Sequence, residues 1–197
     1  MRSKIILASA SARRQELLRQ IGVQFDLVAS NSNEDYDPML LPWQIAQALA
    51  ERKCAAVAVR YPDAFVIAAD TIVVLDEEIL GKPGSAEKAK EMLRKLSNRK
   101  HQVITGLAVE WRVKKIRETL SITTEVVFTS LSHEQVEKYV STGEPLDKAG
   151  AYAVQGLGAT LVQSIQGSHS NIVGLPLFEL GEVLRRHLGD DALWKST

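Results

Sequence analysis

Near its amino end the chain carries Lys4-Ile5-Ile6-Leu7-Ala8-Ser9-Ala10-Ser11-Ala12-Arg13-Arg14-Gln15-Glu16-Leu17-Leu18. A short apolar run gives way to small hydroxyl residues, then to two arginines and an amphipathic run that ends at Gly22. This order predicts a strand, a tight loop and a helix, with Ser11 as the N-cap and Gly22 as the C-cap. Such a loop offers backbone N–H groups, the positive end of a helix dipole and two guanidinium groups, which together favour an anion, phosphate above all.

Helical and extended patterns alternate along the rest of the chain. The spacing of apolar residues and caps predicts helices over residues 42–59, 86–96, 133–140 and 177–188. Strand character is found at residues 25–29, 66–69, 72–75, 103–110 and 118–128, with further short strands expected at 151–154, 160–165 and 172–173. This mixed order predicts an α/β layered fold around a mixed sheet.

Composition limits the classes of protein. A length of 197 residues favours a single domain over 1–197, with room for two lobes. The formal net charge of +0 points to neither nucleic acid nor an anionic membrane, so phosphate chemistry must come from local clusters. The chain has one cysteine, Cys54, which is expected to fill core space in an alanine-rich helix. Without a long apolar stretch or a signal-like segment, no membrane association is expected and the cytoplasm is the expected location.

Asp70 is the most conspicuous acid because it interrupts an apolar run, Val66-Ile67-Ala68-Ala69-Asp70-Thr71-Ile72-Val73-Val74. A carboxylate buried there must be paired or bind a metal. Asp70 is therefore either a functional acid at a strand end, presented by a backbone turn, or a residue that caps a local turn. The residues alone do not decide between these two interpretations.

Other polar residues carry weaker signals. Lys82 lies after an expected hairpin and Lys53 on an expected helix, where lysines are usually solvated. Glu34 lies in an acidic loop with Asp35 and Asp37; such loops are usually hydrated, but carboxylates there and at Asp70 can also supply oxygen ligands to Mg²⁺.

Gln155 precedes a glycine turn and has two interpretations. It is either a residue at a strand end or, because a carboxamide both donates and accepts, a reader of the carbonyl and N–H edge of uracil or thymine.

Several common signatures are absent from the sequence. There is no Gly-x4-Gly-Lys-Ser/Thr loop, no complete dinucleotide fingerprint and no histidine spacing typical of zinc sites.

Four separated segments resemble the Maf family of nucleoside triphosphate pyrophosphatases in family order. They are Leu7-Ala8-Ser9-Ala10-Ser11-Ala12-Arg13-Arg14, the Ala69–Val73 segment, the Asp147–Gly156 segment and the Gly167–Pro176 segment. One departure is Ala12, where the family usually has proline; this change loosens the first helical turn but removes no functional group.

The resemblance implies a two-lobed α/β fold around a bent mixed sheet with a central cleft, and a homodimer. It implies hydrolysis of a nucleoside triphosphate to the monophosphate and pyrophosphate, with dTTP and UTP as substrates and a divalent cation, Mg²⁺ or Mn²⁺, as cofactor. The site residues that it implies are Asp70 as catalytic base and Ser9, Arg13, Arg14, Lys53, Thr71, Lys82 and Gln155 as substrate contacts. Of these contacts, Arg13, Thr71 and Gln155 are implied to set base choice. From their carboxylate chemistry, Asp70 and Glu34 are the expected metal ligands.

Two other functions stay open at this point. Within the same enzyme class, the substrate is instead 7-methyl-GTP or another modified purine triphosphate. Outside that class, the protein is a nucleotide-binding regulator of cell division. A set of cations with an acid, as in Arg13, Lys53 and Asp70, favours catalysis because a sensor has no need of Asp70.

Overall fold

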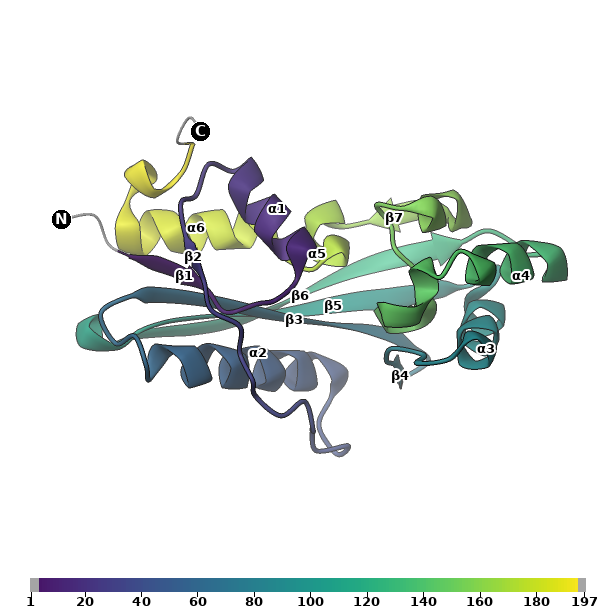
Figure 1. Cartoon of the computed structure of the whole chain (residues 1–197), viewed down its shortest axis with the longest axis horizontal. Helices are drawn as coiled ribbons and strands as arrows, with labels where there is room; N and C mark the ends of the chain where they lie inside the picture. The colour runs from purple at the N-terminus through teal and green to yellow at the C-terminus, as the bar shows by residue number, and fades with distance from the viewer. Residues whose placement is uncertain (1–3, 195–197) are drawn as a thin grey trace. The chain divides into compact units, whose positions relative to one another are not determined.

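The computed structural model describes residues 4–194. Its helices are α1 (Ala12–Gln20), α2 (Pro42–Ala58), α3 (Ala86–Leu96), α4 (His133–Ser141), α5 (His169–Val173) and α6 (Leu177–Leu188) (Figure 1). Its strands are β1 (Ile5–Leu7), β2 (Asp26–Leu27), β3 (Phe65–Leu75), β4 (Glu78–Leu80), β5 (Lys100–Trp111), β6 (Ile116–Phe128) and β7 (Val162–Gln166). Short 3₁₀ helices are η1 (Arg112–Lys114), η2 (Glu144–Asp147), η3 (Ala149–Ala151), η4 (Leu157–Leu161) and η5 (Asp190–Ala192).

Within these residues the strands form one seven-stranded sheet in the order β2-β1-β3-β5-β6-β7, with β4 paired to β3. Strand β1 runs parallel to β2 and β3, whereas β4 is antiparallel to β3 and β7 is antiparallel to β6. The predicted α/β class with a mixed sheet is confirmed.

Most predicted elements are confirmed. In the structure Ser85 caps α3, and Ser132 and Gln135 form a capping box at the start of α4. Two short-strand predictions in the region after α4 are wrong, and a third is confirmed with shifted ends. Residues 151–154 contain no strand, because Ala151 ends a 3₁₀ turn, and residues 172–173 belong to helix α5. The strand expected at 160–165 is β7, Val162–Gln166. Glycines at 150, 156, 158 and 167 interrupt this region, so its backbone turns too often for the short apolar patches to pair as strands.

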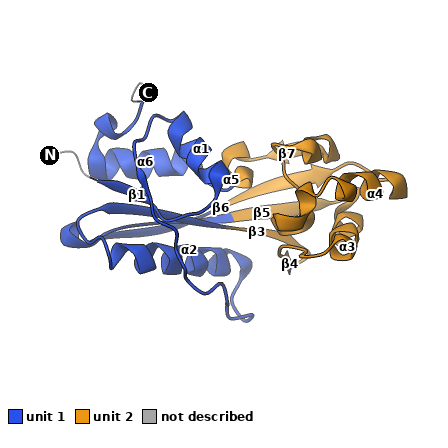
Figure 2. Ribbon diagram, in the orientation of Figure 1, with its two compact units in different colours: residues 1–70, 105–122, 174–197 blue, residues 71–104, 123–173 orange. Residues whose placement is uncertain are grey.

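The chain divides into two compact units (Figure 2). The first comprises residues 1–70, 105–122 and 174–197. In it, α2 covers one face of the strands and α1 and α6 cover the other (Figure 1). Small residues let α2 lie close to the sheet: a Cβ at Gly106 of β5 would be 2.0 Å from the Ala46 carbonyl oxygen. Cys54 is buried there, as predicted, and its burial raises the pKa of the thiol.

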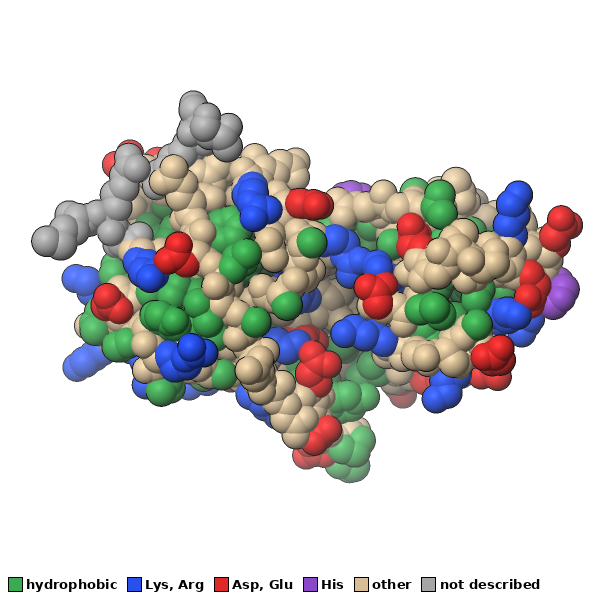
Figure 3. Space-filling view, in the orientation of Figure 1, with side chains coloured by type: hydrophobic (Ala, Val, Ile, Leu, Met, Phe, Trp, Pro, Cys, Tyr) green, Lys and Arg blue, Asp and Glu red, His purple; other side chains and the backbone are tan. Residues whose placement is uncertain are grey.

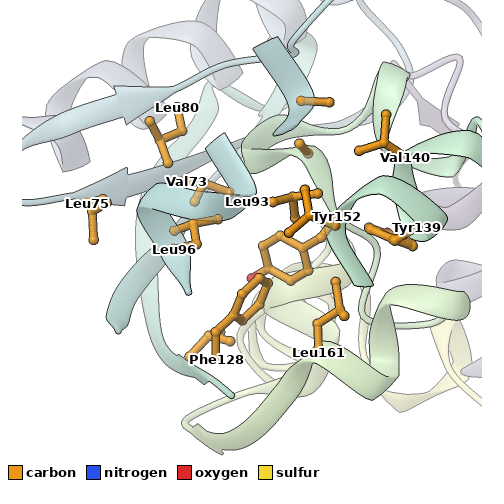
Figure 4. Close-up of a cluster of buried hydrophobic side chains, with 14 of the residues drawn as sticks. Val73, Leu75, Leu80, Leu93, Leu96, Phe128, Tyr139, Val140, Tyr152 and Leu161 are labelled. Atoms are coloured by element: carbon orange, nitrogen blue, oxygen red, sulfur yellow. The ribbon is translucent and has the colours of Figure 1, made fainter. Parts of the chain in front are cut away.

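The second unit comprises residues 71–104 and 123–173 and has a core of its own. Leucines of α3 pack there with Phe128, Tyr139 and Tyr152 (Figure 4). His101 lies in the same core and shares a 2.8 Å hydrogen bond between its Nε2 and the Tyr152 hydroxyl. Burial lowers the pKa of His101 to about 4, so this imidazole is neutral near pH 7.

Acidic and basic side chains are interspersed on the face shown in Figure 3, in keeping with the net charge of +0. None of the helices within residues 4–194 combines the length and apolar character needed to cross a membrane.

Candidate functional site

The loop between β1 and α1 has the predicted form. Ser11 is the N-cap of α1, its side chain accepting from the backbone N–H of Arg14, and the Ser9 hydroxyl accepts from the Ser11 N–H at 3.2 Å. Ser9 is buried, and the first turn of α1 contains no acidic residue. The positive end of the helix dipole is therefore reinforced by Arg13 and Arg14 and is not neutralised by a carboxylate of its own turn.

The Arg14 side chain is held in the first unit by a 2.7 Å hydrogen bond from its Nε to the Gly174 carbonyl oxygen, just before α6. Desolvation lowers the pKa of Arg14, an effect opposed by the charge of Asp70 and, more weakly, by that of Glu34, while Arg13 adds to the lowering. The guanidinium is thus within electrostatic reach of both carboxylates, although it is separated from them by 20 residues or more of sequence.

Asp70 and Glu34 meet at the Lys53 ammonium of α2. Lys53 Nζ donates to Glu34 Oε1 at 2.8 Å and also to Asp70 Oδ1 in a very short contact. The Lys53 and Asp70 side chains keep only 13% and 12% of their surface exposed, whereas Glu34 keeps 64%. The pairing accounts for how Asp70 is tolerated in an apolar strand, since a buried carboxylate requires a compensating charge.

The position of Asp70 corrects one expectation. Residues 66–69 and 72–75 are parts of a single strand, β3, and Asp70 lies inside it without a turn. Side chains of a strand alternate between its two faces. Asp70 can therefore point toward α2 and Lys53 while its neighbours Ala69 and Thr71 point to the other face, and no break in the strand is needed to present it.

Arg52, the residue before Lys53 in α2, holds the acidic loop. Its Nη1 donates to the carbonyl oxygens of Asn33, at 2.9 Å, and Asp35, at 2.6 Å, on either side of Glu34. Because Lys53 binds the Glu34 side chain, two successive residues of α2 hold the same loop. The sequence carries no signal for this contact, because an arginine on an exposed helix face is compatible with any nearby carbonyl.

The weaker carboxylate candidates of this loop have local contacts. Asp37 Oδ1 accepts from the Met39 N–H at 2.9 Å, and the Asp35 carboxylate accepts from the Asn33 side-chain amide. Glu34 is thus the loop carboxylate that the structure brings to Lys53.

Three further candidates belong to the second unit, beyond the boundary after Asp70. Thr71 follows in β3 and is partly buried. Lys82 follows the β3–β4 hairpin, as predicted, and is exposed in the segment that leads to α3. Gln155 is exposed in the loop between η3 and η4.

The segment that ends at Pro176 has a structural role. The Asn171 side chain is buried and its Nδ2 donates to the Val103 carbonyl at 3.1 Å and to Thr124 Oγ1 at 3.0 Å. The same segment contains His169, which begins helix α5.

The residues around Lys53 fit a divalent cation in donor type. Asp70 Oδ1 and Glu34 Oε1 converge on one cationic atom, and carboxylate oxygens are the protein ligands that Mg²⁺ prefers. Within residues 4–194 no group of three or more His, Cys, Asp and Glu side chains is arranged to hold a metal. A pair of carboxylates is nevertheless typical of Mg²⁺ sites in which water and substrate phosphates complete the coordination.

The fold is α/β, and a cationic helix N-terminus lies beside a lysine and two carboxylates. A protein with a site of this kind belongs to the class that binds polyanions such as phosphorylated ligands. The chain belongs to the family described as Maf-like protein, whose model matches residues 4–187.

Curated relatives cover nearly the whole chain. The dTTP/UTP pyrophosphatase of Desulforamulus reducens is 48% identical over 181 residues, which are 92% of this chain and 95% of that protein. The dTTP/UTP pyrophosphatase of Bacillus velezensis is 45% identical over 185 residues, 94% of this chain and 97% of that protein. Among solved structures, a HAM1 protein from Coxiella burnetii matches with a TM-score of 0.47 and 16% identity, over 93% of this chain and 99% of that one.

Proposed function

We propose that this protein is a nucleoside triphosphate pyrophosphatase that hydrolyses dTTP and UTP to the monophosphate and pyrophosphate. The observation that carries the proposal is the nearly buried Asp70–Lys53 pair, with Glu34 on the same ammonium and the Arg14 guanidinium within electrostatic reach. Relatives that bear the name dTTP/UTP pyrophosphatase, at 43–48% identity, support the substrate class.

In the proposed mechanism the cations of the first unit neutralise the triphosphate. Arg13 and Arg14 bind phosphate oxygens at the N-terminus of α1, with Ser9 in the same loop, and Lys53 adds a charge from α2. We propose Lys82 as a further phosphate contact and Arg13, Thr71 and Gln155 as the residues that select the base.

Asp70 is the proposed base. Its carboxylate orients a water molecule and accepts a proton from it while the water oxygen attacks the α-phosphorus. The bond between the α-phosphorus and the α–β bridging oxygen then breaks, and pyrophosphate leaves. Asp70 and Glu34 would also hold Mg²⁺ or Mn²⁺, which when bound supplies Lewis-acid polarisation of phosphoryl oxygens. Fixed charges aimed at the developing negative charge are the main source of acceleration in this scheme.

The test is pyrophosphate release by the purified protein with Mg²⁺ or Mn²⁺ from a panel of nucleoside triphosphates, including 7-methyl-GTP. Release from dTTP and UTP with little from purines supports the proposal. Release from 7-methyl-GTP alone keeps the chemistry and overturns the base preference. No release from any substrate with either metal overturns the enzymatic function and favours a nucleotide-binding regulator of cell division.

We further propose that the protein is a homodimer in the cytoplasm. Sedimentation equilibrium gives the oligomeric state, and a mass equal to that of the single chain of 21.7 kDa would overturn the dimer. Fractionation of the source cells tests the location.

A further inference from the structure

The carboxylate of Glu144, in η2, is surrounded by donors from a loop that follows it in sequence. Glu144 Oε1 accepts from the Tyr139 hydroxyl at 2.8 Å and from the Gly158 N–H at 2.9 Å. Glu144 Oε2 accepts from the Leu157 N–H at 3.0 Å. Both oxygens of this partly buried side chain are therefore engaged, and two of the three donors are backbone groups of the loop.

Tyr139, on α4, holds the other end of the same loop. While donating to Glu144, its hydroxyl accepts from the Ala153 N–H at 3.2 Å. The loop 153–158, whose last two residues begin η4, is thus fastened at its first residue by Tyr139 and at its last two by Glu144. Gln155 lies between these points, and its side chain is exposed.

Two glycines allow the loop to approach these side chains. A Cβ at Gly156 would lie 2.0 Å from Glu144 Oε2, and a Cβ at Gly158 would lie 2.5 Å from the Tyr139 hydroxyl oxygen. Gly156 has a φ of −108°, so the requirement there is for space and not for a left-handed backbone. The glycines on the C-terminal side of Gln155 therefore leave room for Glu144 and Tyr139, the two side chains that hold the loop.

The Glu144 carboxylate is charged where it binds the loop 153–158. Burial alone raises its pKa, but hydrogen bonds from Gly158, Tyr139 and Leu157, together with the charge of Lys148, hold the pKa below its usual range. Glu144 is therefore ionised at neutral pH, and hydrogen bonds to an ionised acceptor are stronger than those between neutral groups.

We propose that Glu144 and Tyr139 are positioning residues that set the base preference of the enzyme by holding the loop that carries Gln155. The inference rests on the proposed function and deepens it. Selection by hydrogen bonding requires the reading group to sit at a fixed place, because a loosely held group adapts to the wrong partner. Leu157, the largest apolar side chain of this loop, is 59% exposed, so packing does little to fix the loop and the Glu144 carboxylate supplies the constraint.

The first experiment compares the kcat/KM values for UTP and CTP in the wild type and in Glu144→Gln. CTP shares the sugar and the triphosphate with UTP and differs at the ring edge that Gln155 is proposed to read. A carboxamide cannot accept at both ends, so an N–H₂ group must face either the Leu157 N–H or the donors at the other oxygen. We expect the UTP:CTP ratio to fall about tenfold, the change that corresponds to losing one such hydrogen bond. Amide hydrogen exchange at residues 153–158 is expected to accelerate in parallel.

Glu134→Gln is the matched control, since Glu134 is an exposed residue of α4 in the same unit. It is expected to leave the ratio unchanged. Tyr139→Phe removes one donor to Glu144 and the acceptor for Ala153 while keeping the ring, so it is expected to lower the ratio by a smaller factor. This second variant keeps the proposal testable if Glu144→Gln does not fold.

A double mutant tests whether Glu144 acts through Gln155. In a Gln155→Ala background, Glu144→Gln is expected to have little further effect on the ratio; full additivity would overturn the proposal. An unchanged ratio in both Glu144→Gln and Tyr139→Phe, in a wild type that prefers UTP, overturns this inference and leaves the proposed function standing. A wild type that hydrolyses no triphosphate overturns both.

Discussion

Lys53 and Asp70 form an ion pair that is almost fully removed from solvent, with side chains only 13% and 12% exposed. Lys53 also binds Glu34, so a single ammonium faces two carboxylates from different parts of the chain. A pair of this kind is costly to desolvate and is weak evidence of stability by itself. The charge of Asp70 also acts on Arg14, at the cationic start of α1.

Asp70→Asn is expected to lower turnover of dTTP and UTP by about 10²- to 10⁴-fold, because the amide cannot accept the proton of the attacking water. The fold is expected to persist, since Lys53 keeps Glu34 as a partner. Steady-state kinetics measure the loss, and circular dichroism with a thermal melt confirms folding. Near-normal turnover in a folded variant would remove Asp70 from the mechanism.

Lys53→Met leaves Glu34 and Asp70 without the ammonium that binds both carboxylates. We expect the variant to unfold at a lower temperature than the wild type and to recover more on addition of Mg²⁺, because a divalent cation replaces the missing charge between the carboxylates. Differential scanning calorimetry with and without MgCl₂ measures the two shifts. An equal gain from Mg²⁺ in both proteins would argue against a metal held by these carboxylates.

Gln155→Glu tests the proposed reading of the base. A carboxylate accepts but cannot donate, so it cannot pair with both the carbonyl and the N–H of a uracil or thymine ring. The kcat/KM for UTP is expected to fall about tenfold or more relative to that for purine triphosphates. Unchanged preference would mean that other residues select the base.

The lowered pKa of His101 makes the stability of the protein depend on pH. Its folded pKa is about 4, below the ordinary value of 6.5, because burial disfavours the charged ring. Between these values the unfolded chain binds a proton that the folded chain does not, so the free energy of unfolding falls as pH drops, by about 1.4 kcal/mol per pH unit.

Urea titrations from pH 7 to pH 4 on the wild type and on His101→Gln measure this contribution as the difference in slope. The variant cannot take up the proton and is expected to show a shallower loss of stability over the same range. Parallel slopes would show that the imidazole is not held neutral.

Gly106→Ala tests the close approach of α2 to β5. The added Cβ would lie 2.0 Å from the Ala46 carbonyl oxygen, a backbone atom that moves only if the helix moves. We expect a loss of about 3 kcal/mol or more in the free energy of unfolding, at the upper end of what overpacking costs. Gly81→Ala is the control, because a Cβ there meets nothing within 4 Å; equal effects of the two changes would contradict the packing.

Much of the fold was predictable from local patterns. The Ser11 and Ser85 caps, the capping box at Ser132 and the leucine spacing of α6 each depend on residues within one or two helical turns. The region after α4 was less predictable because closely spaced glycines, such as Gly156, let the backbone turn where short apolar patches favour strands.

The sequence by itself determined the strand–loop–helix start, the mixed α/β class and the motifs that mark the family, because these depend on near neighbours along the chain or on residue identity. Only the tertiary structure decided that Asp70 lies within a continuous strand against Lys53, that Arg52 holds the acidic loop and that Glu144 holds the loop of Gln155. Each of these contacts joins a polar side chain to a partner set by the path of the backbone in space. A polar residue is compatible with many such partners, so its identity in the sequence does not select one.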